Sequence, residues 1–103
     1  MDNSSSGAMM PRYRCHKEVW ALKIKAIEYD SDNALLEGRE TDGSAIITPI
    51  ESGYAAFKVD RQFVKHRLPV NGPIVGGYFV VYKDGYQSFS PSDAFEEGYS
   101  RIA

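Results

Sequence analysis

The sequence of 103 residues has little of what disulfide or metal stabilisation requires, because it contains one cysteine, Cys15, and two histidines, His16 and His66. A single cysteine cannot close an intramolecular disulfide, and no Cys-x-x-Cys or His-x-x-x-His spacing is present, so we predict no metal site and no cofactor. A run of about 18 apolar residues and a signal-like segment are also absent. We therefore predict a cytoplasmic protein that makes no membrane contact.

An excess of one charge is missing as well. The chain has 12 lysines and arginines against 14 aspartates and glutamates, which gives a net charge of −2. Nucleic-acid-binding proteins gather their basic residues in a patch or stripe. In this chain the basic residues are spread along the sequence instead. We therefore predict no nucleic-acid partner.

The composition along the chain indicates one domain. Residues 1–8 include a Ser-Ser-Ser-Gly stretch and are interpreted as a disordered expression leader before a native start at Met9 or Met10. Residues 9–103 form a single predicted α+β domain, long enough to bury one modest core.

The first element is predicted from its alternating pattern. Apolar and polar residues alternate with a period of two over residues 18–29, which predicts a strand with Trp20, Leu22 and Ile24 on one face. The Asp-Ser-Asp-Asn stretch at 30–33 predicts a turn, because short polar side chains bond their own backbone.

Two further strands are expected to form a hairpin. Residues 34–41 predict a second strand, and Asp42-Gly43 is a hairpin signal that would pair it with a third strand over residues 44–48. Residues 53–59 predict another short extended segment.

A helix is predicted over residues 61–68. Asp60 is placed to cap its first turn, and Phe63, Val64 and Leu68 fall on one side of it. This side is expected to face the core.

The C-terminal quarter carries the strongest local signal. Asp84-Gly85 lies between two runs of aromatic and β-branched residues, which predicts a hairpin with a two-residue type I′ turn. Counting outward from that turn pairs Val80 with Phe89, an aromatic to β-branched pair.

A second short helix should follow the hairpin. Ser90 is the expected N-cap and Pro91 the first helical residue, Gly98 is the expected left-handed stop, and residues 99–102 would return as a strand. Together the elements predict an α+β fold with a small twisted antiparallel sheet of about five or six strands and two short helices.

No catalytic constellation emerges from the residues. Cys15 and His16 are adjacent, and neighbours on a strand point to opposite faces, so they do not form the pair that activates a thiolate. The glycines lack the Gly-Lys-Ser/Thr of a phosphate loop, and the serines lack a partner His and Asp. These glycines and serines are Gly72, Gly76, Gly77, Ser88 and Ser90. We predict that the protein is not an enzyme.

Tyrosines give the candidate binding surface. The chain is 13% aromatic with seven tyrosines, more than a small core needs, and tyrosine anchors many interfaces. Whether this cluster is core or binding surface stays open at this point. The candidate binding residues are Tyr78, Tyr82, Lys83, Tyr86, Tyr99 and Arg101.

Residues 13–24, Lys65-His66 and residues 76–99 resemble a group of small uncharacterised phage and prophage proteins. Those proteins share a basic first strand and a closing pattern of Gly-Gly-Tyr, an aromatic run, Asp-Gly-Tyr, Ser-Phe-Ser-Pro, Phe and Gly-Tyr. The resemblance covers most of residues 11–102 and implies a phage origin with no assigned enzymatic activity. A fainter similarity of the end region links it to phage proteins that sequester nucleotide immune signals.

The sequence and its resemblance together predict a phage accessory protein that binds a host factor, such as a defence or regulatory component, in the cytoplasm of an infected bacterium. The alternative is a protein that binds a small molecule, such as a nucleotide signal, at an oligomer interface. We also predict a homodimer or higher homo-oligomer, because the edge strands of a small open sheet need a cover.

Overall fold

The computed structural model describes residues 19–99. The predicted leader, the Cys15-His16 pair, Arg101 and the strand expected after residue 99 lie wholly or mostly outside these residues.

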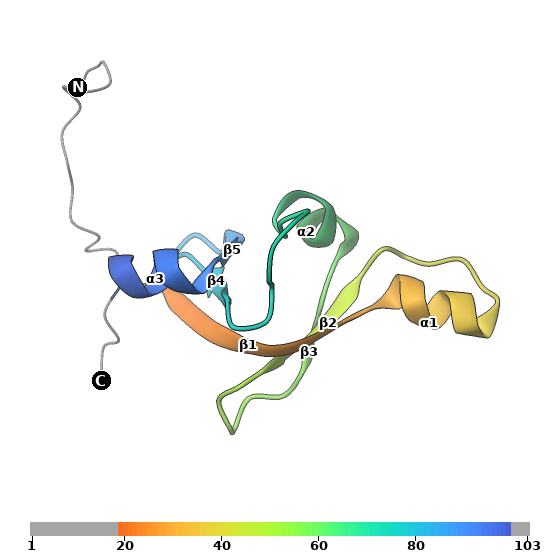
Figure 1. Cartoon of the computed structure of the whole chain (residues 1–103), viewed down its shortest axis with the longest axis horizontal. Coiled ribbons are helices and arrows are strands. Elements are labelled where there is room, and N and C mark those ends of the chain that lie inside the picture. Colours follow the sequence, from red (N-terminus) through yellow and green to blue (C-terminus); the bar gives the residue numbers. More distant parts are fainter. Residues whose placement is uncertain (1–18, 100–103) are drawn as a thin grey trace, which may run out of the picture.

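The described residues form an antiparallel sheet with three helices (Figure 1). In chain order the elements are β1 (Trp20–Tyr29), α1 (Asp30–Glu37), β2 (Ala45–Pro49), β3 (Phe57–Val59), α2 (Arg61–His66), β4 (Tyr78–Val81), β5 (Gln87–Ser90) and α3 (Ser92–Gly98). The strand order is β3-β2-β1-β4-β5. The predicted α+β class and antiparallel sheet are confirmed, with one helix more than the sequence analysis expects.

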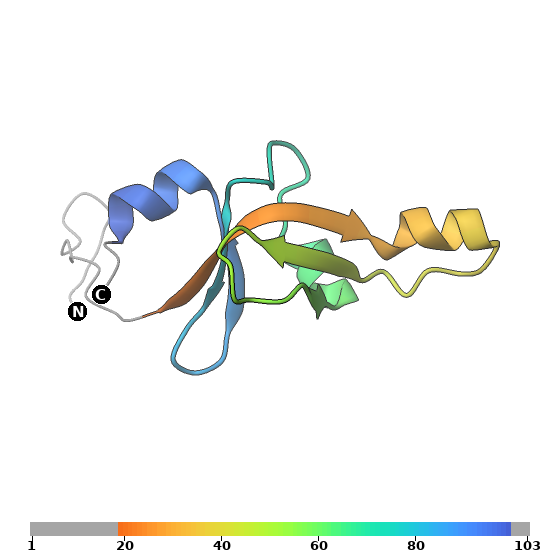
Figure 2. The same ribbon diagram turned by 90° about the horizontal axis from the view of Figure 1, so that it is seen from below.

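The central strand β1 is shared by the two halves of the sheet. Residues 20–23 pair with β4, and residues 24–29 pair with β2. A register shift between Ile24 and Ala26 places a β-bulge where the partner changes, and a bulge bends a strand and increases its twist. Figure 2 shows the resulting curvature of β1 along the length of the molecule.

The core fills the inside of the curled sheet. Phe57 on β3 lies 4.7 Å from Phe79 on β4 between ring centroids, although β2 and β1 separate these strands in the sheet. Phe63 of α2 packs on the same Phe79 ring at 5.4 Å. With α2 between β3 and β4 and the β4–β5 hairpin beside β1, the described strands form an open five-stranded sheet that curls around this core.

The expected strand over residues 34–41 is wrong, because α1 occupies its first half and no strand forms in the second half. Ala-Leu-Leu-Glu are good helix formers, and Gly38 at φ 70° ends the helix with the Arg39 N–H bonded to the Ala34 carbonyl. The hairpin expected at Asp42-Gly43 is therefore absent, and β2 pairs with β1 and β3 instead.

The closing hairpin is confirmed, but its predicted register is wrong by one residue. Phe79 pairs with Phe89, and Val80 pairs with Ser88. The Gly85 N–H bonds to the Tyr82 carbonyl, and Gly85 alone in the turn has a positive φ, of 89°. The loop thus has three residues with glycine in the left-handed position, rather than the two of a type I′ turn.

The helix boundaries need smaller corrections. The Asp60 cap is confirmed, since its carboxylate accepts a 2.9 Å hydrogen bond from the Phe63 N–H, although α2 ends at His66. In α3 the cap position belongs to Pro91 rather than Ser90, and Gly98 has no positive φ.

Candidate functional site

Candidate side chains gather in three places. The turn cluster consists of Tyr82, Lys83 and Tyr86 with Arg67, the residue that follows α2. The ring stack consists of Tyr78, Phe95 and Tyr99. The α1 tip consists of Leu35 and Leu36.

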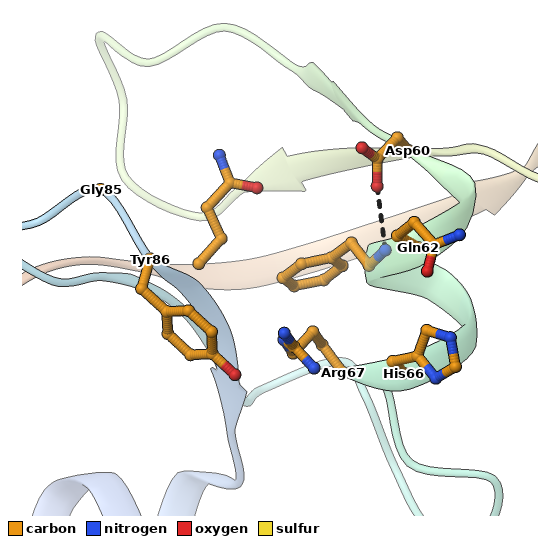
Figure 3. Close-up of a pocket in the computed structure, with 8 residues that line it drawn as sticks. Asp60, Gln62, His66, Arg67, Gly85 and Tyr86 are labelled. Carbon is orange, nitrogen blue, oxygen red and sulfur yellow. Dashed lines mark hydrogen bonds between the residues drawn. The ribbon is translucent and has the colours of Figure 1, made fainter.

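The turn cluster borders an open pocket of about 240 Å³ between α2 and the β4–β5 turn. The Arg67 guanidinium lies 4.7 Å from the centre of the Tyr86 ring, and the Tyr82 ring lies 5.9 Å from it. Figure 3 shows Tyr86 and Arg67 facing each other across the pocket, with His66 on the same helix. The lining residues are Asp60, Gln62, Phe63, His66, Arg67, Gly85, Tyr86 and Gln87.

The chemistry of this pocket suits a polar or anionic group. The Tyr86 ring holds the Arg67 side chain in one orientation. The N–H donors at the edge of the guanidinium can then bind a carboxylate or a phosphate with two hydrogen bonds. The α2 sequence adds Arg61 and Lys65 nearby in the chain. The pocket is smaller than the usual 300–1,000 Å³ of small-molecule sites, so it fits one side chain or one small group of a partner.

The ring stack fastens α3 to the sheet. The Tyr78 and Phe95 rings are stacked 4.2 Å apart between centroids, and the Phe95 and Tyr99 rings 4.6 Å apart. Beside them the Glu96 carboxylate accepts hydrogen bonds from Lys23 at 2.9 Å and from the Tyr78 hydroxyl at 2.8 Å. The Lys23 ammonium lowers the pKa of Glu96, and burial together with Glu96 raises the pKa of Tyr78. These contacts are structural.

The α1 tip is the most exposed apolar feature of a helix or strand. Leu35 is 82% exposed and Leu36 is 86% exposed. The one buried residue of α1 is Ala34. Figure 1 shows α1 at the end of the described molecule opposite α3. A single exposed leucine is ordinary, whereas two adjacent ones on a projecting helix make the α1 tip a candidate contact surface.

A network around Asp30 holds the α1 tip in place. Its carboxylate accepts two hydrogen bonds from the Arg39 guanidinium, at 2.9 and 3.1 Å, one from the Thr41 hydroxyl at 2.9 Å and one from the Asp42 N–H at 3.2 Å. The Arg39 guanidinium, followed by the other two donors, holds the pKa of Asp30 well below its usual range. The Asp30 N–H also bonds to the Ser44 carbonyl. The helix is therefore tied to β2 at its base.

The structure divides the predicted binding residues between two places. Tyr82, Lys83 and Tyr86 lie together at the β4–β5 turn, whereas Tyr78 and Tyr99 belong to the ring stack.

Sequence reasoning missed Arg67 and the α1 tip. Arg67 gives no signal in the sequence, because it meets Tyr86 through the fold. The α1 tip could have been found from the helix formers of 34–37 followed by Gly38.

Residues 19–99 also bear on metal binding and on membrane crossing. Within residues 19–99, no three His, Cys, Asp or Glu side chains come close enough to hold a metal ion. In the same part of the chain, no helix combines the length and the apolar content that crossing a bilayer requires.

Comparison with known proteins gives one informative relative. No family model and no curated protein matches the chain. A solved structure that matches is the monomeric form of the phage L decoration protein, determined in solution by NMR, with 30% sequence identity and a TM-score of 0.54. The match covers 97% of this chain but 65% of the phage L protein, so the chain spans about two thirds of its relative's length. The similarity supports the prediction that this is a phage protein.

Proposed function

We propose that this protein decorates a phage particle, attaching to the outer surface of the assembled capsid without catalysing a reaction. The observation that carries the proposal is the 30% identity to a phage decoration protein over nearly the whole chain. A fold match at this identity says more than architecture alone, although fold by itself does not imply function.

The surface of the described residues is compatible with this role. The α1 tip offers exposed apolar side chains for a protein contact, and the turn cluster offers tyrosine and arginine, which are enriched at interfaces. Both features are typical of a surface that binds another protein.

Binding of a host defence or regulatory factor is the second proposal, and the turn cluster supports it. Arg67 stacked on Tyr86 is the kind of anchor that contributes most at interfaces. Capture of a small nucleotide signal has weaker support, because the pocket of about 240 Å³ is smaller than most small-molecule sites.

Sedimentation with capsids tests the first proposal. Capsids would be assembled from the major capsid protein of the phage genome that encodes this chain, mixed with the purified protein and centrifuged through a sucrose cushion. We expect the protein to sediment with the capsids and to saturate at a fixed ratio to the capsid subunit. A protein of equal size that is foreign to phages is the control for trapping.

The same preparation distinguishes the second proposal. If the protein stays in the supernatant at excess capsid, and if an immobilised sample captures a host protein that the Tyr86→Ala variant fails to capture, the decoration proposal is wrong. Saturable sedimentation with capsids by wild type and Tyr86→Ala alike would instead reject the host-factor proposal for the turn cluster.

A further inference from the structure

We propose that the α1 tip is the docking element for the capsid, and that its binding site there is an apolar socket ringed by basic side chains. This inference rests on the proposed function and adds the surface and the chemistry of the partner. Leu35 and Leu36 are 82% and 86% exposed. Their helix is held by polar contacts at its two ends, and not by burial of these two side chains.

The tip is shaped before it binds. The Asp30 network ties the loop after α1 to the first turn of the helix, and Gly38 ends the helix with two backbone hydrogen bonds to the last turn. A convex element that is already ordered loses little conformational entropy on docking, so more of the contact energy appears as affinity. A flexible loop carrying the same leucines would bind more weakly.

The charge around the tip defines the partner. Residues 28–42 carry one basic side chain, Arg39, and it is engaged with Asp30 and Glu37. The carboxylates of this segment are Glu28, Asp30, Asp32, Glu37, Glu40 and Asp42. Asp30 and Glu37 are paired with Arg39, and Asp42 is paired with Lys58, whereas Asp32 and Glu40 take no part in these ion pairs. The remaining excess of negative charge beside the two leucines favours a socket with an apolar floor and a basic rim.

The same charges argue against a second copy of the chain on this surface. A two-fold contact brings the same patch of both copies together, so the carboxylates would face one another. Like charges placed opposite each other disfavour such a partner. The capsid is therefore the occupant that we infer.

Other exposed apolar residues lack this setting. Val70 is 95% exposed, but it lies in a loop and no residue next to it in sequence is an exposed large hydrophobic residue. It provides a matched control, because a polar substitution there changes the apolar surface without touching α1.

The test compares the double variant L35S/L36S with wild type, with L35M/L36M and with V70S in the capsid sedimentation assay. Loss of two buried leucine contacts should weaken capsid binding by on the order of 100-fold or more. The methionine variant keeps flexible apolar volume and should bind within a few-fold of wild type, as should V70S. A circular dichroism melt of each variant confirms that the fold is kept.

Charge is tested separately with D32N/E40Q, because neither carboxylate takes part in the Asp30 network. The capsid affinity of this variant should decrease less steeply with salt concentration than that of wild type, because fewer carboxylates face the basic rim of the socket. Equal affinity of L35S/L36S and wild type for capsids would overturn the inference while leaving the proposed function intact. Absence of wild-type binding would overturn both. Self-association of wild type that L35S/L36S abolishes would overturn the capsid as occupant.

Discussion

Asp30 connects the stability of the α1 tip to pH. Its carboxylate is an acceptor for Arg39, Thr41 and Asp42, which lowers its pKa in the folded protein. In the unfolded chain the pKa returns to about 3.9. Since the folded pKa is the lower one, the stabilising effect is fully present above about pH 4 and is lost as the pH falls towards the folded pKa.

Asp30→Asn should therefore lower the free energy of unfolding most at neutral pH. The difference from wild type should shrink as the pH is lowered from about 7 to about 3, because wild type loses its advantage while asparagine does not titrate. Urea unfolding at a series of pH values measures this difference. Asp32→Asn is the control, and a difference for Asp30→Asn that stays constant down to about pH 3 would contradict the prediction.

Gly85 is required for its backbone conformation and not because a side chain would lack room. Its φ is 89°, and a Cβ atom there would meet nothing within 4 Å. Gly85→Ala should destabilise the domain by about 1–2 kcal/mol, the cost of a left-handed conformation for an L-residue. Thermal unfolding measures the effect.

Gly98 provides the matched comparison. It also has open space around its Cβ position but no positive φ, and it ends α3. Gly98→Ala should be neutral or stabilising by up to about 1 kcal/mol. Similar losses at both positions would contradict the assignment of the cost to the turn conformation of Gly85.

Among the elements, α3 depends on Phe95. This ring is stacked between Tyr78 and Tyr99, and α3 has no buried residue. Phe95→Ala should release α3 from the sheet, because it removes both aromatic contacts, each worth about 0.5–1.5 kcal/mol.

Hydrogen exchange measures this release. The amides of Phe95 and Tyr99, which bond to Pro91 and Phe95 carbonyls, should exchange faster in the variant while β2 and β3 amides are unchanged. Asp93→Asn in the same helix is the control. An equal increase in the amide exchange rates of α3 and β2 would show that α3 unfolds together with the rest of the domain.

The elements also show what a sequence predicts well. Strand β1, the Asp60 cap, α2 and the closing hairpin follow from local patterns, because alternation, capping and turn residues act within a few positions. The strand expected over 34–41 is wrong because the polar residues 30–33, which also favour turns, form the first turn of a helix that the helix formers 34–37 continue. The hairpin register is wrong by one because Asp-Gly serves two-residue and three-residue loops alike.

The candidate site could be predicted only in part for a related reason. Tyr82, Lys83 and Tyr86 are close in sequence and stay close in the fold. Arg67 joins them because it follows α2, which packs beside the hairpin, and Tyr78 is separate because its ring stacks on Phe95 of α3. Contacts of long sequence separation have no local pattern that indicates them.

For the molecule as a whole, the predicted homo-oligomer remains a prediction. Among the strands of residues 19–99, β3 and β5 are the edges of the sheet, and each pairs with one neighbour. Since open edges invite pairing with another chain, we expect a two-fold dimer at micromolar concentration. Sedimentation equilibrium measures the mass, and a single species of 11.5 kDa would contradict the expectation.

The sharing of β1 between the two halves of the sheet has a consequence for degradation. A protease needs an extended, unpaired segment, and within β1 the residues that pair with β4 are followed directly by those that pair with β2. A cut in β1 would separate the two halves of the sheet, so we expect cleavage there to require opening of the sheet. If the protein decorates a particle outside its host, as proposed, the single strand shared by both halves would add to its durability.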